Sequence, residues 1–137
     1  MVFNEAGLWQ AAYGSVDKYK HYFPLMLNAI PATSHTIWLN TVAIHPIHFK
    51  SGLQRHKGKK KWHFTEPRIE LINQLSQGFV KHHNQANPAK QIQSVNIWSK
   101  TILREDAPKS RHDMRHYKDT VYMDIIDQLL LSPQILI

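Results

Sequence analysis

The chain has 137 residues, of which 42% are hydrophobic and 20% are charged, and this ordinary globular usage excludes a largely disordered protein. A formal net charge of +7 favours acidic partners such as nucleic acid, anionic lipid or acidic glycans, and the lack of cysteine excludes a disulfide framework and thiolate chemistry. The sequence shows neither an apolar run of membrane-spanning length nor a signal-peptide pattern, so no localisation is predicted.

The first half of the chain predicts a strand, a helix and a second strand. Residues 1–4, "MVFN", form a short apolar strand that is cut off at Asn4. A helix is predicted over 15–30, with Ser15 as its N-cap and only Pro24 against it, because apolar residues recur there at helical spacing: Tyr19, Tyr22, Phe23, Met26 and Ile30. Residues 35–44, "HTIWLNTVAI", are rich in β-branched and aromatic residues and predict a mostly buried strand.

The second half continues the alternation after a long polar loop. Helical spacing of Ile69, Ile72, Leu75, Phe79 and Val80 predicts a second helix. Residues 91–102, "QIQSVNIWSKTI", predict a third strand, and a closing helix carries Val121, Tyr122, Ile125, Ile126, Leu129 and Leu130. The order β-α-β-α-β-loop-α favours an α/β fold with a parallel sheet and helices on its faces.

The first strand begins at residue 1, although a strand in such a sheet is expected to pair on both edges. We therefore expect that N-terminal strands are missing and that residues 1–137 are the C-terminal portion of one domain, with no second domain. An exposed sheet edge and an apolar face around Tyr19, Phe23 and Met26 are expected as a consequence. A protein partner or a second copy would complete the sheet.

Two stretches carry a family resemblance: "VFNEAGLWQAAYGSVDKYKHYF", which begins at Val2, and "DMRHY", which begins at Asp113. They resemble the SGNH/GDSL-type serine hydrolases, in particular the PC-esterase branch, where a strand ends in Asn followed by Leu-Trp and a D-x-x-H motif precedes the last helix. The resemblance implies a three-layer α/β/α hydrolase. In it Asn4 would be an oxyanion-hole side chain, and Asp113 would orient the catalytic base His116.

The chain departs from the family pattern at the nucleophile. The G-D-S-like serine block and the later glycine block are absent, Asn4 stands one residue further from Leu8 than expected, and Gln10 replaces the usual Asp. No serine of the chain lies in a glycine-flanked strand-to-helix turn. The sequence therefore predicts the C-terminal portion of a serine esterase that is inactive as this chain.

Other interpretations of the same residues stay open. The chain can be a non-catalytic, basic SGNH-like subunit of a larger assembly, with or without nucleic acid, or a basic RNA-binding protein unrelated to hydrolases. Asp113 and His116 can also be polar residues of a loop, with the aspartate near the positive end of the following helix.

A basic run and several histidines complete the candidate binding residues. The run "KGKKKWHF" offers contacts to a polyanion through Lys57, Lys59, Lys60 and Lys61, or is a solvated loop. His45 and His48 are three apart, but Pro46 between them prevents one helix from presenting both rings, and no Glu completes a zinc-hydrolase motif. We therefore predict no metal site and no cofactor.

Overall fold

The computed structural model describes residues 2–4, 14–44, 65–104, 108–110 and 113–130. Side chains are described within three of these stretches, 14–44, 65–104 and 117–127, whereas the remaining residues are described by their backbone.

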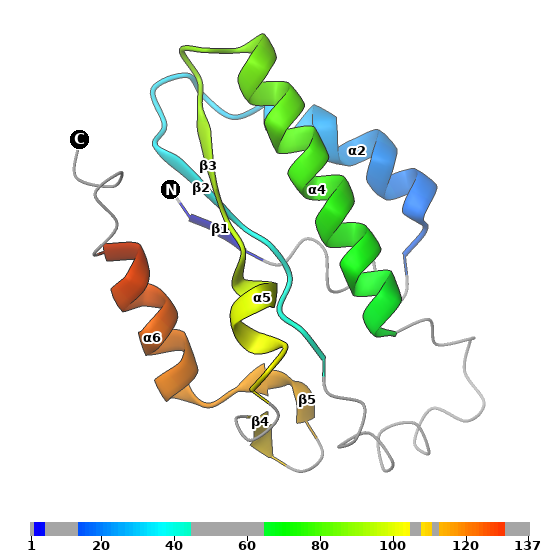
Figure 1. Ribbon diagram of the computed structural model, residues 1–137. Coiled ribbons are helices and arrows are strands. Elements are labelled where there is room, and N and C mark those ends of the chain that lie inside the picture. The colour runs from blue at the N-terminus through cyan, green and yellow to red at the C-terminus, as the bar shows by residue number, and fades with distance from the viewer. Residues whose placement is uncertain (1, 5–13, 45–64, 105–107, 111–112, 131–137) are drawn as a thin grey trace.

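Three short strands form a parallel sheet, as the alternating sequence pattern predicts. They are β1 (Val2–Asn4), β2 (Thr36–Leu39) and β3 (Ile92–Val95), in the order β1-β2-β3 (Figure 1). The register pairs Asn4 with Leu39 and Leu39 with Val95, so all three strands end at one edge of the sheet. This is the carboxyl edge, where ligands bind in open α/β sheets.

Two helices pack together over one face of this sheet. Helix α2 (Val16–Asn28) begins at Ser15, whose hydroxyl accepts the amide of Lys18 at 3.3 Å, and continues through Pro24. Helix α4 (Glu66–Ala86) lies beside it. Their apolar side chains meet the sheet in one core cluster, which contains Tyr19, Phe23, Leu27, Ile30, Trp38, Ile44, Ile69, Ile72, Val80 and Ile92.

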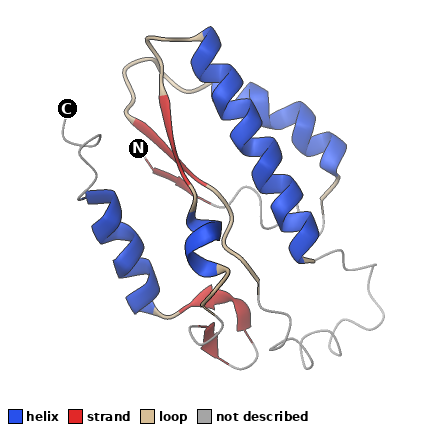
Figure 2. Ribbon diagram, viewed as in Figure 1, coloured by secondary structure: helices blue, strands red, loops and turns tan. Residues whose placement is uncertain are grey.

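A second apolar cluster gathers around helix α6 (Asp119–Leu130). Side chains along β2 alternate between the two clusters: Trp38 belongs to the first, and its neighbours Ile37 and Leu39 belong to the second. Figure 2 shows α6 apart from the pair of long helices, with the strands between them. The chain thus has an α/β fold whose sheet contributes side chains to a separate apolar cluster on each face.

The predicted strand over 91–102 is wrong in its second half. The chain leaves the sheet after Val95, and Asn96 caps a short helix, α5 (Ile97–Thr101), by accepting the amide of Ser99 at 3.1 Å. An asparagine that can bond a backbone amide three residues ahead favours a helix start over a continuing strand. The strand predicted over 35–44 is likewise shorter and is confined to β2.

The loop predicted before the last helix contains two short strands. They are β4 (Pro108–Ser110) and β5 (Asp113–Tyr117), which pair in antiparallel orientation with Pro108 opposite Tyr117. Asp113 and His116 therefore lie on a strand and not, as expected, in a loop. The hydrophobic pattern did not reveal this pair because both strands are short and polar.

The expectation of an exposed apolar face around Tyr19, Phe23 and Met26 is also wrong. Tyr19 and Phe23 are 4% and 3% exposed, because α4 covers them, and Met26 packs partly buried against the same cluster. The large apolar side chains of α2 that do face solvent are Tyr22 and Leu25.

Candidate functional site

The segment that follows β2 crosses the carboxyl edge of the sheet. Residues Asn40 to Ile44 are all buried, yet they belong to no strand. Buried backbone amides and carbonyls that lack a sheet partner must be bonded in another way, since leaving them unpaired is costly. Side chains of α4 and α5 supply those bonds.

Three side chains of α4 and α5 bond the backbone of this segment. The amide of Asn73 on α4 binds Thr41 on both sides, accepting from its N–H at 2.9 Å and donating to its C=O at 3.0 Å. The Thr101 hydroxyl of α5 accepts the N–H of Ala43 at 2.9 Å. Glu66 Oε2, in the first turn of α4, accepts the N–H of Ile44 at 2.9 Å.

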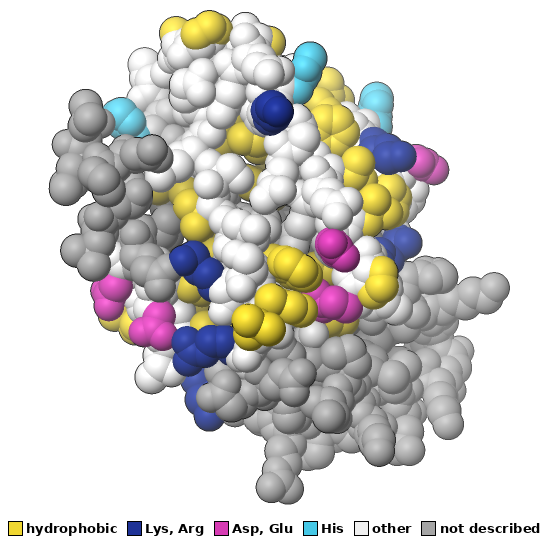
Figure 3. All heavy atoms as spheres, in the orientation of Figure 1, with side chains coloured by type: hydrophobic (Ala, Val, Ile, Leu, Met, Phe, Trp, Pro, Cys, Tyr) yellow, Lys and Arg dark blue, Asp and Glu magenta, His cyan; other side chains and the backbone are white. Residues whose placement is uncertain are grey.

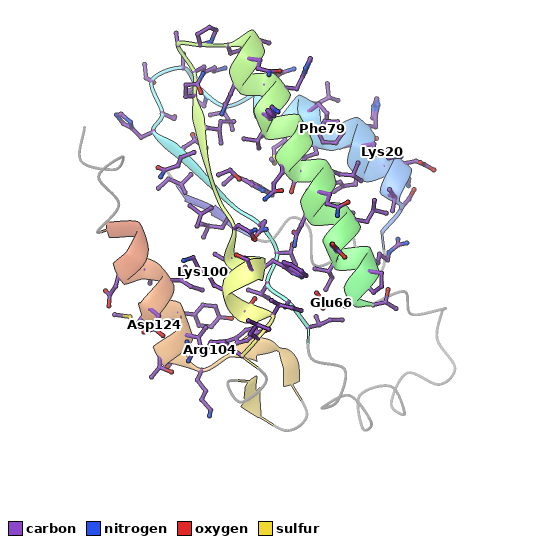
Figure 4. All side chains as sticks on the ribbon, in the orientation of Figure 1. Lys20, Glu66, Phe79, Lys100, Arg104 and Asp124 are labelled. Atoms are coloured by element: carbon purple, nitrogen blue, oxygen red, sulfur yellow. The ribbon has the colours of Figure 1, made fainter. Side chains whose placement is uncertain are left out.

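Glu66 also connects α4 with α5. Its second carboxylate oxygen, Oε1, accepts the indole N–H of Trp98, so the two oxygens of one carboxylate bond two different segments. Figure 4 shows Glu66 at the end of α4 that approaches α5. Because hydrogen bonds to a charged acceptor are stronger than neutral ones, Glu66 is a structural anchor of this edge.

Asparagines that follow β2 and β3 bond each other at the same edge. Asn40 donates from Nδ2 to Asn96 Oδ1 at 2.8 Å and accepts the backbone N–H of Trp98 at 3.0 Å. The start of α5 is therefore fixed to the end of β2. The functional signal that sequence reasoning overlooked here is a pair of polar residues, Asn40 and Thr41, inside an otherwise apolar run.

Tyr117 attaches the end of β5 to this edge. Its side chain is buried, and its hydroxyl donates to the Ala43 carbonyl at 3.0 Å, with the Thr101 carbonyl 3.3 Å away. Burial raises the pKa of the Tyr117 phenol well above its usual value, the Thr101 side chain opposes that rise, and the charge of Glu66 adds to it. The phenol is thus a neutral donor at physiological pH.

The backbone of β5, with Asp113 and His116, ends at Tyr117, whose hydroxyl bonds Ala43 in the segment that follows β2. The side chains of Asn4, Asp113 and His116 lie outside the described residues, and their mutual geometry stays a prediction. The lysines of the basic run, Lys57 and 59–61, also lie outside them.

One face of the molecule shows how charged side chains of the described residues are distributed. Figure 3 shows Lys and Arg side chains dispersed among hydrophobic and polar ones on the face that it draws. One ion pair, Arg104 with Asp124 at 2.9 Å, connects the residues after α5 with α6, as Figure 4 also indicates. Both side chains are exposed, so this pair contributes little to stability.

Two further observations concern metals and membranes. In the part of the chain that the structure describes, acidic residues and histidines form no group of three or more that could hold a metal ion. Across the same described ranges, none of the helices combines the length and apolar character needed to cross a bilayer.

Comparison of the chain with protein-family models, curated proteins and solved structures finds no match. The class that fold and geometry define is therefore an α/β protein with a polar, side-chain-bonded segment at the carboxyl edge of its parallel sheet.

Proposed function

We propose that this chain carries the base half of an SGNH-like acyl-hydrolase site in a three-layer α/β/α domain. His116 is the general base, Asp113 orients its ring, and Asn4 donates a hydrogen bond to the oxyanion. The nucleophilic serine comes from polypeptide outside these 137 residues, since the chain has no G-D-S-like block.

One observation supports this proposal above the others. Tyr117, directly after His116, bonds through its hydroxyl to Ala43, three residues beyond the asparagine that follows β2. This bond joins the end of β5 to the segment that leaves the carboxyl edge of the parallel strands, and open α/β sheets place their reacting groups at that edge. The two apolar clusters, one with α2 and α4 and one with α6, are also what a three-layer arrangement requires.

The chemistry explains the choice of residues. Acyl transfer needs a base that removes the proton of a serine hydroxyl, and a carboxylate that keeps the imidazole in the correct tautomer and stabilises the imidazolium as it forms. An amide donor aimed at the developing oxyanion contributes about 2.7–4 kcal/mol of transition-state stabilisation in hydrolases. Asp113, His116 and Asn4 have the side chains for these three roles.

The test measures whether Asp113 and His116 interact, and it does not require the nucleophile. In an NMR titration of the imidazole nitrogens, with the His116 signals assigned through the His116→Gln variant, Asp113→Asn is expected to lower the pKa of His116, because it removes the negative charge that stabilises the imidazolium. It should also change the tautomer population of the neutral ring.

The matched control is Asp119→Asn, which removes an exposed carboxylate at the same sequence distance from His116, on its other side. This variant should leave the His116 titration nearly unchanged. If both variants shift the pKa of His116 equally, or neither does, the two residues form no catalytic pair and the proposal is wrong.

A further inference from the structure

The outer edge of β3 has an unusual partner. Among the described strands, ordered β1-β2-β3, strand β3 pairs with β2 on one side and with no strand on the other. Within a parallel strand, the N–H and C=O of one residue point to the same side, and successive residues alternate between sides. Since the Val95 carbonyl accepts from Asn40 on the β2 side, at 3.2 Å, the amide and carbonyl of Ile92 and of Ser94 point outward.

The side chain of Asn84 occupies the first of these outward positions. From the last turns of α4, its Oδ1 accepts the N–H of Ile92 at 2.8 Å and its Nδ2 donates to the Ile92 carbonyl at 2.8 Å. One primary amide therefore makes the same two bonds that a neighbouring strand would make. Gln91 reinforces the arrangement by donating to the Asn84 backbone carbonyl at 2.9 Å.

Beyond Ile92, none of the described strands pairs with this edge. Ser94 is exposed, and it lines a groove of about 570 Å³ between β3 and α4, together with Lys81, Asn84 and Asn96. Two residues of this edge, Ile92 and Ser94, thus have outward-pointing backbone groups. Asn84 bonds those of Ile92, whereas Ser94 is exposed. An open strand edge is the usual template for association with another chain.

We propose that Asn84 closes the β3 edge against a second copy of this chain. Without it, two copies would pair their β3 strands in antiparallel orientation about a two-fold axis, with Ile92 of one copy opposite Ser94 of the other. Both residues point outward, and four bonds would form across the axis. Each of the four bonds joins Ile92 of one copy to Ser94 of the other. By bonding the N–H and C=O of Ile92 from within the chain, Asn84 occupies one partner of every bond and removes this pairing.

The test compares self-association by sedimentation velocity over a concentration series. Asn84→Ala should self-associate about tenfold more tightly than the wild type, as expected for additional backbone bonds between copies. The double variant Asn84→Ala with Ser94→Pro should return to the wild-type behaviour, because proline removes an outward N–H that β2 does not use. Gln85→Ala, an exposed neighbour that also lines the groove, is the control and should not change association.

Association that persists in the double variant, or an Asn84→Ala variant that stays as monomeric as the wild type while remaining folded, would overturn the proposal. If Asn84→Ala does not fold, amide hydrogen exchange in the wild-type chain tests whether the edge is bonded at Ile92 and uncovered at Ser94. The Ile92 amide should be strongly protected and the Ser94 amide should exchange quickly. Equal protection of Ser94 and Val95 would mean that the edge is already covered, and the proposal would fall.

Discussion

At the residue scale, buried polar side chains replace strand pairing at the carboxyl edge of the sheet. Asn73 and Thr101 are 5% and 0% exposed, and each bonds the backbone of the segment after β2. Burying an amide or hydroxyl is costly unless it is hydrogen-bonded, and here the bonds run to backbone groups that would themselves be unpaired. Removal of the Asn73 amide therefore leaves two unsatisfied backbone groups at Thr41, and removal of the Thr101 hydroxyl leaves one, the N–H of Ala43.

The buried phenol of Tyr117 makes the stability of the fold depend on pH. Burial raises the phenol pKa in the folded state above the unfolded value of about 10, and burial does the same for Tyr19. The stability that these neutral phenols contribute is fully present below about pH 10 and is lost as the pH rises further. Denaturant unfolding at pH 8 and above pH 10 should show this decline.

Tyr117→Phe should lower the free energy of unfolding at pH 8 by about 1–3 kcal/mol, because the Ala43 carbonyl loses its donor. The alkaline decline should also become shallower, since one of the buried phenols is gone. Tyr22→Phe, which removes a hydroxyl from an exposed ring, is the matched control. An alkaline decline of unchanged steepness in Tyr117→Phe would contradict this account.

At the element scale, the stability of a short helix depends on bonds to neighbouring segments. Helix α5 has five residues, too few for a helix to be stable alone, and its first turn is fixed through Asn96 to Asn40. Helix α2 has 13 residues and an extensive buried face, so it depends less on its cap. The N-cap hydrogen bond therefore contributes more to the stability of α5 than to that of α2.

The two caps should differ when each is replaced by alanine. Ser15→Ala loses one long bond, to Lys18, and should cost about 0.5–1 kcal/mol of unfolding free energy. Asn96→Ala loses the bond to Ser99 and the bond from Asn40, and should cost about 2 kcal/mol. Equal losses in chemical denaturation would show that the contact between Asn40 and Asn96 adds nothing.

At the scale of the whole molecule, the sheet of described strands is narrow, and its apolar side chains pack with the helices. Two apolar clusters share the strand β2, whose alternate residues divide between them. The carboxyl edge lies where the segment after β2, α5 and β5 meet, while the amino ends of β2 and β3 border a separate cavity of about 920 Å³. The proposed function assigns acyl-transfer chemistry to the first of these two ends.

A catalytic assay tests the proposed function at this scale. The purified 137-residue chain should hydrolyse an aryl acetate no faster than its His116→Ala variant, because a base and an oxyanion donor without a nucleophile provide only residual assistance. Turnover that is abolished both by His116→Ala and by a serine-directed inhibitor would identify a serine of this chain as the nucleophile. The proposed external serine would then be wrong.

Local hydrophobic spacing and local backbone bonding were enough to predict the alternation of strands and helices, the parallel sheet and the cap at Ser15. Three features became visible only in the folded chain: the third strand ends at Val95, Asp113 and His116 lie on a strand, and Tyr19 and Phe23 are covered. The bonds at the carboxyl edge join residues as much as 74 positions apart, such as Tyr117 and Ala43. No local pattern encodes such a contact, since it exists only after the helices have packed on the sheet.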